Sequence, residues 1–370
     1  LVQILTNVTS LAELIYSDNP ESHIQLIDGI YYLINEGDFV ALTVSPKNVN
    51  DITNISILPS NITGIGNYTF SSCTGLTGVL DLSNYTNLTS IGAGAFQYCR
   101  GLINITLPSN LTSIGASAFS DCSGLTSISL PSSLTSIGDA AFYRCSGLET
   151  LEYKGTVEQW LSIDFGSSWM GDISHTFIVN GEELTNLVVP EGVTSIGSNA
   201  FYGCTGLTSI TLPLSLTSIG NSAFNGCSGL TSIALPSRLR TIGNAAFSYC
   251  SELTSITLPS SLTSIGDYAF DSCSKLTNIT LPSSLTSIGD SAFYYCRALT
   301  SVTINQYVFR NVTSSSYSCG HLLDNIDSGE TVLVPANLID AGLTNSYLDG
   351  SSFTRSETAN EDGFYVYTKN

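Results

Sequence analysis

The cysteines are the residues of this chain that most directly suggest chemistry, because thiols can form disulfides or bind zinc. There are ten of them, and from Cys204 to Cys319 each lies 23 residues after the one before. No Cys-x-x-Cys pair occurs, and the cysteines occupy one equivalent position in a repeat. We therefore predict that the cysteines from Cys73 to Cys296 form a column of reduced, buried thiols that pack as small apolar side chains.

Acidic and amide side chains recur at a second equivalent position, and such a row of oxygen ligands could bind calcium. The row consists of Asp139, Asn221, Asn244, Asp267 and Asp290. Asp, Asn and Ser are also the residues that cap the free N–H groups of a helical turn, and Ser198 occupies the same position. We favour capping, and we expect no metal site.

Catalysis requires unlike groups that converge, whereas a repeat supplies the same group many times. The three histidines, His23, His175 and His321, lie far apart in the sequence. No His-Glu-x-x-His, Gly-x-Ser-x-Gly, phosphate-binding or EF-hand motif is present. We expect no catalytic residue, no cofactor and no enzymatic activity.

The elements that position these residues are repeats, and the 23 residues from Leu253 to Lys275 are representative. Their Leu-x-x-Ile-x-Leu segment predicts a short strand in which Ile256 points inward. Pro259 ends this strand, because a residue without an N–H group cannot extend a hydrogen-bonded ladder. Gly266 then allows the chain to turn.

The spacing of the apolar residues after Gly266 predicts the structure of the last part of the repeat. Phe270, Cys273 and Leu276 recur every three residues, which indicates a short helical or 3₁₀ turn. One repeat cannot bury these residues alone, so stacked neighbours must supply the core. A period of about 23 residues with Leu-x-x-Ile-x-Leu inside it is typical of leucine-rich solenoids. We predict an α/β-type leucine-rich repeat solenoid, mostly of short strands with short helical or 3₁₀ turns and capped at both ends.

The full consensus, Cys-x-x-Leu-x-x-Ile-x-Leu-Pro-x-x-Leu-x-x-Ile-Gly-x-x-Ala-Phe-x-x, resembles the BspA-like (bacterial surface protein A) class of leucine-rich repeats. The resemblance extends from about Ile62 to Thr303, with one interruption. Members of this class are associated with binding host matrix proteins such as fibronectin and fibrinogen. The resemblance therefore implies a bacterial or microbial protein that is secreted or on the cell surface and has an adhesin-like role.

The repeat pattern divides the chain into five regions. They are an N-terminal cap at 1–50, repeats at 51–151, an irregular insertion at 152–183, repeats at 184–304, and a C-terminal irregular repeat and cap at 305–370. Within the N-terminal cap, the apolar runs on either side of Asn35-Glu36-Gly37-Asp38 predict a hairpin.

The insertion holds both tryptophans, Trp160 and Trp169. Thr156 begins a predicted short helix, and Asn180-Gly181 predicts a hairpin turn. We favour the interpretation that the tryptophans are buried against the solenoid. In the alternative interpretation they anchor an interface, because Trp is enriched at binding hot spots and the insertion interrupts an otherwise uniform surface.

Composition limits the kinds of partner. The formal net charge is −19, charged residues make up only 11% of the chain, and the 11 basic residues are scattered. We expect no nucleic-acid partner, because no basic stripe is present to displace counterions. No apolar run has transmembrane length, so we expect no membrane insertion, and we expect a monomer.

Alternation along the strands predicts a row of small, uncharged side chains that point outward from a concave sheet. With the tryptophans, the candidate binding residues are Trp160, Trp169, Ser209, Thr211, Ser232, Ser255, Thr257, Asn278 and Thr280. The row is either ordinary solvated strand surface or a broad recognition surface. Our main hypothesis is non-enzymatic binding of a host or matrix protein. The alternative is carbohydrate recognition or nutrient capture by the concave face and the insertion, which aromatic rings from the insertion beside the row would favour.

Overall fold

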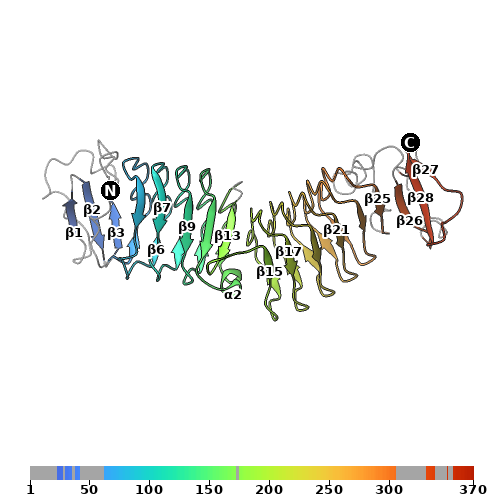
Figure 1. The fold of residues 1–370 in the computed structure, drawn as a ribbon, viewed down its shortest axis with the longest axis horizontal. Coiled ribbons are helices and arrows are strands. Elements are labelled where there is room, and N and C mark those ends of the chain that lie inside the picture. Colours follow the sequence, from blue (N-terminus) through green and yellow to red (C-terminus); the bar gives the residue numbers. More distant parts are fainter. Residues whose placement is uncertain are drawn as a thin grey trace. The chain divides into compact units, whose positions relative to one another are not determined.

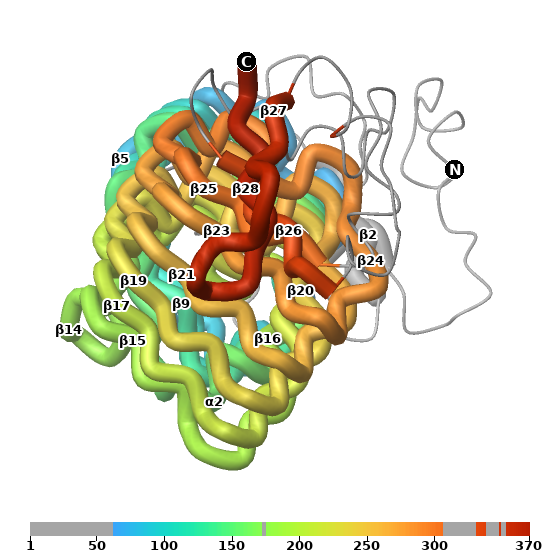
Figure 2. Tube along the Cα trace, turned by 90° about the vertical axis from the view of Figure 1, so that its right-hand side faces the viewer, coloured from blue at the N-terminus to red at the C-terminus, as the bar shows by residue number. Residues whose placement is uncertain are grey.

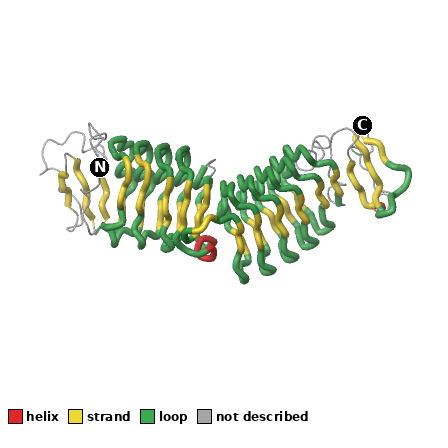
Figure 3. Tube along the Cα trace, in the orientation of Figure 1, coloured by secondary structure: helices red, strands yellow, loops and turns green. Residues whose placement is uncertain are grey.

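Two units, Leu1–Glu183 and Leu184–Asn370, make up the chain, and each is described by itself. The computed structural model describes the strand backbones at 23–27, 30–35 and 38–41, and then residues 62–171, 175–305, 331–337, 348 and 353–370. In both units, repeats of strand and turn follow one another as coils of a solenoid (Figure 1, Figure 3). There are about 10 turns of about 23 residues, which confirms the predicted repeat.

Each repeat has three sides: a long strand, a two-residue strand and a run of tight turns. In a representative repeat the long strand is β21 (Ser255–Thr257) and the short strand is β22 (Ser264–Ile265). Ile256 and Ile265 are buried, because successive side chains of a strand point to opposite faces and these two point inward. Figure 2 shows the long strands β17 to β25 on one side of the second unit's coil and the short strands β16 to β24 on the other.

The long strands form parallel sheets in which each strand pairs with its counterpart in the next repeat. In the first unit the order is β14-β13-β11-β9-β7-β5, and β14 is antiparallel. These strands are β5 (Gly78–Asp81), β7 (Leu102–Thr106), β9 (Ser127–Leu130), β11 (Thr150–Tyr153), β13 (Thr176–Val179) and β14 (Glu182–Glu183). The second unit begins with β15 (Asn186–Val188), β17 (Ser209–Thr211), β19 (Ser232–Ala234) and β21.

The last long strands of the second unit form a mixed sheet of order β23-β25-β26-β28-β27. They are β23 (Asn278–Thr280), β25 (Ser301–Thr303), β26 (Thr331–Pro335), β27 (Phe353–Arg355) and β28 (Phe364–Lys369). β26 continues the parallel arrangement beside β25, whereas β28 is antiparallel to both β26 and β27.

The short strands form a second parallel sheet in each unit. In the first unit they are β4 (Gly64–Ile65), β6 (Ser90–Ile91), β8 (Ser113–Ile114), β10 (Ser136–Ile137) and β12 (Asp164–Phe165). In the second unit they are β16 (Ser195–Ile196), β18 (Ser218–Ile219), β20 (Thr241–Ile242), β22 and β24 (Ser287–Ile288).

An antiparallel meander precedes the short strands of the first unit. It consists of β1 (His23–Ile27), β2 (Ile30–Asn35) and β3 (Asp38–Ala41), and β3 pairs in parallel with β4. The predicted hairpin across residues 35–38 is confirmed, because β2 and β3 pair with Asn35 opposite Asp38.

The third side of each repeat is a run of tight turns, so the predicted helical or 3₁₀ turn is wrong there. Alternate residues donate their N–H groups to the next repeat: Ala245 to the carbonyl oxygen of Asp267 at 2.7 Å, and Phe247 to that of Ala269 at 2.7 Å. Ala245 and Tyr249 have left-handed backbones, with φ of 51° and 58°. The N–H groups of the intervening residues bond within the turn, as that of Ser248 does to the carbonyl oxygen of Ala245 at 3.1 Å. A helix needs consecutive right-handed residues, and the left-handed ones interrupt it.

Phenylalanine rings form the centre of the core. Rings from successive repeats are stacked, with centroids 5.1–5.4 Å apart, in two columns: Phe70, Phe96, Phe119 and Phe142, and Phe201, Phe224, Phe247, Phe270 and Phe293. Every ring is fully buried, and the inner rings of each column lie between the rings of two neighbours. The core therefore exists only in the stacked array.

Residues of the irregular insertion take part in the solenoid. β12 pairs with β10, and β13 pairs with β11, as the strands of an ordinary repeat would. The connection between β11 and β12 contains α2 (Val157–Leu161), whose first N–H groups are capped by Thr156 in a capping box with Gln159. The predicted helix and the predicted hairpin turn at Asn180-Gly181 are both confirmed.

Candidate functional site

The outward faces of the two sheets of long strands in the second unit carry the predicted row. We call these residues the outward row: Ser209, Thr211, Ser232, Ser255, Thr257, Asn278 and Thr280. All are exposed except Ser209, which is half-buried, and the middle residue of each strand is buried. The alternation predicted from the sequence is confirmed.

Parallel pairing aligns the outward row into columns. Ser209 lies opposite Ser232, and Ser232 lies opposite Ser255. Neighbouring strands are about 4.8 Å apart, so similar side chains follow one another at that spacing. The result is a flat series of like groups.

Most hydroxyl groups of the outward row are available to a ligand. Ser232, Ser255, Thr257 and Thr280 have no side-chain hydrogen bond within the described part of the chain. Ser209 differs, because its hydroxyl donates to Oδ1 of Asn186 at 2.5 Å. The row therefore presents donors and acceptors but no charge.

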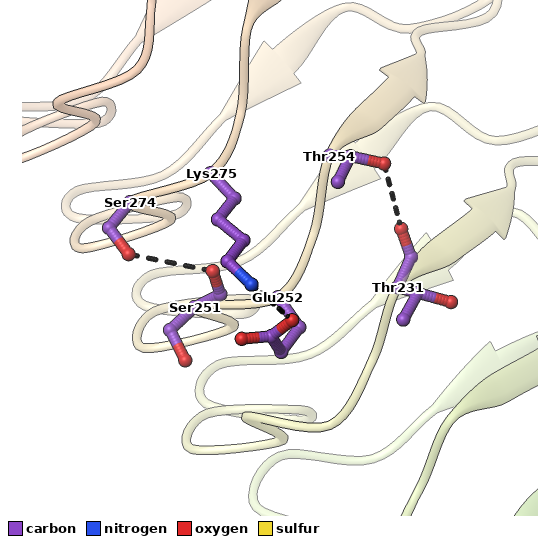
Figure 4. A network of polar contacts seen from close by, with 6 residues as sticks. All are labelled: Thr231, Ser251, Glu252, Thr254, Ser274 and Lys275. Carbon is purple, nitrogen blue, oxygen red and sulfur yellow. Dashed lines mark hydrogen bonds and ion pairs between the residues drawn. The ribbon is translucent and has the colours of Figure 1, made fainter.

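The hydroxyls beside the row have a structural role (Figure 4). The Thr254 hydroxyl donates to the carbonyl oxygen of Thr231 at 3.4 Å, and the same bond recurs between the equivalent threonines of neighbouring repeats. Nearby, Lys275 and Glu252 form an exposed ion pair, with Nζ 2.6 Å from Oε2. These groups join one repeat to the next.

The outward row is not uniform. Val188, which lies opposite Thr211, is 61% exposed, and Ala234 replaces the hydroxyl residue of β19. Apolar groups therefore interrupt the hydroxyl series near its N-terminal end. Such breaks can give selectivity to a surface that is otherwise repetitive.

The structure does not place Trp160 and Trp169 on the surface. Each is about 1% exposed, and they pack in one aromatic cluster with ring centroids 5.9 Å apart. Trp169 also continues the first phenylalanine column, at 6.2 Å from Phe142. Their rings are not available to a partner, and the interpretation of buried tryptophan agrees with this packing.

The corresponding face of the first unit carries equivalent side chains that are not among the predicted binding residues. Asn104, Thr106, Ser127, Ser129 and Thr150 hold the same outward positions on β7, β9 and β11. Glu152 adds a charge there and pairs with Lys154. The Leu-x-x-Ile-x-Leu pattern also predicts these positions, because the residues on either side of its isoleucine point outward.

The row of acidic and amide side chains caps backbone groups, but not those of a helix. Oδ1 of Asn221 accepts from the N–H of Asn244 at 2.9 Å, Asn244 caps Asp267 in the same way, and Asp267 caps Asp290 at 2.7 Å. The predicted helix cap is wrong because the capped group belongs to the next repeat. The described residues contain no group of three or more side chains placed to hold a metal ion.

A shallow groove of about 760 Å³ lies over the short strands of the first unit. It is lined by Ser90, Ser113 and Ser136 from successive repeats, with Asp139 and Asp164 toward its later strands. The three serines are equivalent groups repeated along the stack, and no histidine of the described residues lines the groove.

The family of the chain follows from its repeats. The model for the BspA type leucine-rich repeat region matches in 6 copies, over residues 47–168, 172–300 and 242–333. The chain therefore belongs to the BspA-type leucine-rich repeat family. Leucine-rich repeat proteins typically bind proteins.

Similar folds occur among solved structures. The pneumococcal vaccine antigen PcpA is 22% identical, with a TM-score of 0.54 over 78% of this chain and 82% of that one. A leucine-rich repeat protein from Bacteroides ovatus is 25% identical, with a TM-score of 0.45 over 86% and 71%. A leucine-rich cell surface protein from Faecalibacterium prausnitzii is 22% identical, with a TM-score of 0.41 over 79% and 96%.

The comparison with curated proteins found no match. In the part of the chain that the structure describes, no helix combines the length and apolar character needed to cross a bilayer.

Proposed function

We propose that this protein is a non-enzymatic binding protein, secreted or on the bacterial cell surface, that recognises another protein in an adhesin-like role. The observation that carries this proposal is the outward row, which presents hydroxyls on strand after strand, most of them without a hydrogen-bond partner among the described residues. Solenoids of stacked repeats commonly use such extended faces for recognition.

Two further facts support the proposal. The described polar groups repeat as equivalents and do not converge as unlike groups, which favours binding over catalysis. One solved relative is named a cell surface protein and another a vaccine antigen, which favours an external location. A host matrix protein is the partner we would test first.

Carbohydrate recognition is the alternative. It would be favoured by aromatic rings beside the outward row, but the rings of Trp160 and Trp169 are buried. A glycan ligand would therefore depend on hydroxyls alone, which is a weaker arrangement than hydroxyls combined with stacking.

The test is a binding screen of the parent protein against immobilised matrix proteins and a glycan array, followed by one matched pair of variants. Thr257→Arg places a large charged side chain in the outward row, whereas Thr106→Arg makes the same change at an exposed strand position of the first unit. We expect Thr257→Arg to weaken binding to the partner at least tenfold and Thr106→Arg to leave it unchanged. Equal effects of the two variants would place the site elsewhere.

A further expectation follows from the charge of −19. A basic patch on a protein partner would speed association, and salt screens this attraction. We expect the association rate to fall as salt rises from about 0.05 to about 0.5 M, whereas a neutral glycan would bind equally well throughout.

A further inference from the structure

Four tyrosines are exposed on the tight turns of the last regular repeats of the second unit. Tyr249 is 58% exposed, Tyr268 48%, Tyr295 46% and Tyr294 36%. We call these four residues the tyrosine surface. They lie on the turn side of the repeat, so this surface is distinct from the outward row.

Backbone hydrogen bonds place the four tyrosines on the turns of neighbouring repeats. The N–H of Tyr249 donates to the carbonyl oxygen of Asp271 at 2.8 Å, and the N–H of Ser272 donates to that of Tyr294 at 2.7 Å. The ring centroids of Tyr294 and Tyr295 are 4.1 Å apart. The rings therefore project from three consecutive repeats of a rigid stack.

The fold does not require tyrosine at these positions. Tyr249 and Tyr268 have left-handed backbones, with φ of 58° and 55°, a conformation that favours glycine and disfavours larger side chains. The residue equivalent to Tyr249 is Gly226 in the preceding repeat and Ser272 in the following one. Ser291 is the equivalent of Tyr268 in the next repeat. Large rings at strained positions that small residues fill equally well indicate a role other than folding.

Similar turns of this chain show what such tyrosines bind. The guanidinium carbon of Arg100 lies 5.9 Å from the ring centroid of Tyr98, and that of Arg144 lies 5.2 Å from Tyr143. Within the tyrosine surface, Arg297 lies 5.1 Å from Tyr295. A cation over a tyrosine face is attracted by the ring quadrupole, and arginine is the most frequent partner.

Two rings of the surface have no such cation. No arginine or lysine stacks on Tyr249 or Tyr268 among the described residues. The repeats that carry the tyrosine surface contain four acidic residues (Glu252, Asp267, Asp271 and Asp290) and four basic ones (Arg238, Arg240, Lys275 and Arg297), and Lys275 is already paired with Glu252. The net charge of −19 over the whole chain adds to the attraction for a cation.

We infer that the tyrosine surface binds an arginine-bearing segment of a partner protein, with guanidinium groups stacked on Tyr249 and Tyr268. The partner arginines take the place that Arg297 takes on Tyr295. This binding site is separate from the outward row, because the two surfaces share no residue. Binding at each surface can therefore be tested independently of the other.

The experiment measures binding of a fluorescent 12-residue peptide of alternating arginine and glycine, and of the same peptide with glutamine in place of arginine. The double variant Tyr249→Ser, Tyr268→Ser introduces the residue found at the equivalent positions Ser272 and Ser291, so it keeps both the fold and the net charge. Tyr68→Ser is the matched control, since Tyr68 is also left-handed and 51% exposed but lies in the first unit.

We expect the arginine peptide to bind the parent and the Tyr68→Ser control equally and the double variant about tenfold more weakly, as two lost cation–π contacts would give. Each single variant should lose about threefold. If the double variant binds like the parent, the peptide is held by net charge alone and the inference is wrong. Equal binding of the glutamine peptide would also overturn it, because the rings would then stack on neutral ligands.

Discussion

The thiol of Cys273 donates a hydrogen bond to the carbonyl oxygen of Phe247 in the preceding repeat, with Sγ 3.2 Å from the oxygen. The same bond joins Cys250 to Phe224 and Cys296 to Phe270. The cysteine column is therefore more than the set of small apolar side chains that its spacing predicts. Each thiol also gives a second hydrogen bond to a buried carbonyl group that already accepts a backbone N–H, as the carbonyl of Phe247 does from Cys250 at 3.2 Å.

The predicted burial of nine cysteines is confirmed, because those from Cys73 to Cys296 are all free and buried. We expect an alkylating reagent to label none of these nine within minutes in the native protein and all of them after denaturation. Counting the added mass under both conditions checks this. Rapid native labelling of most thiols would show that the column is open to solvent.

Stability should fall in alkaline solution. Burial raises the pKa of Cys73, Cys145 and Cys296 to about 12, so the folded state holds these protons more tightly than the unfolded state does. The stabilisation is complete below about pH 8.5 and is lost as pH rises toward the folded pKa, at about 1.4 kcal/mol for each thiol and each pH unit. Denaturant midpoints between pH 7 and 10 test this, and a Cys145→Ala variant should show a shallower decline than the parent.

A central phenylalanine should matter far more than a peripheral one. Phe247 is fully buried between Phe224 and Phe270, each 5.4 Å away, and we expect Phe247→Ala to cost about 3–5 kcal/mol because a cavity remains in the stack. Phe364, in β28, is only half-buried, and its replacement should cost much less. Equal shifts of the two melting curves would mean that β28 belongs to the core.

Close contact between repeats should make Gly243 essential for stability, whereas Gly197, at an equivalent position, should be replaceable. A Cβ atom on Gly243 would lie 2.7 Å from backbone atoms of Asn221 and Gly220, whereas one on Gly197 would meet nothing within 4 Å. We expect Gly243→Ala to destabilise the protein by about 1–3 kcal/mol and Gly197→Ala to change stability by less than about 0.5 kcal/mol. Chemical denaturation of the two variants provides the measurement, and a neutral Gly243→Ala would show that the repeats can separate.

The buried tryptophans should report on folding and not on binding. We expect Trp160→Ala to cost about 3–5 kcal/mol, since Trp160 packs against Tyr153, Phe165 and Phe177. Acrylamide should quench the tryptophan emission of the native protein weakly. Strong quenching, together with a folded Trp160→Ala variant of parental stability, would restore the interpretation of an exposed anchor.

Much of the fold follows from local patterns in the chain. The period of 23 residues, the burial of Ile256 and the outward direction of Ser255 and Thr257 depend only on repetition and on strand alternation, which neighbouring residues specify. The capping box at Thr156 is equally local, since its two hydrogen bonds span three residues.

Other features depend on the stacking of one repeat on the next, which no single repeat encodes. A spacing of three residues from Phe270 to Cys273 predicts a helical turn, but alternate residues of such turns, such as Ala245, give their N–H groups to the following repeat. Asp267 likewise caps a residue 23 positions away, and Trp160 is buried because β12 and β13 complete an irregular repeat around it. The sequence alone therefore determined the repeat and its inward and outward faces, whereas the tertiary structure decided the turn conformation, the capping partners and the burial of the tryptophans. The physical reason is that hydrogen bonds between repeats satisfy backbone groups that an isolated repeat would have to satisfy within itself.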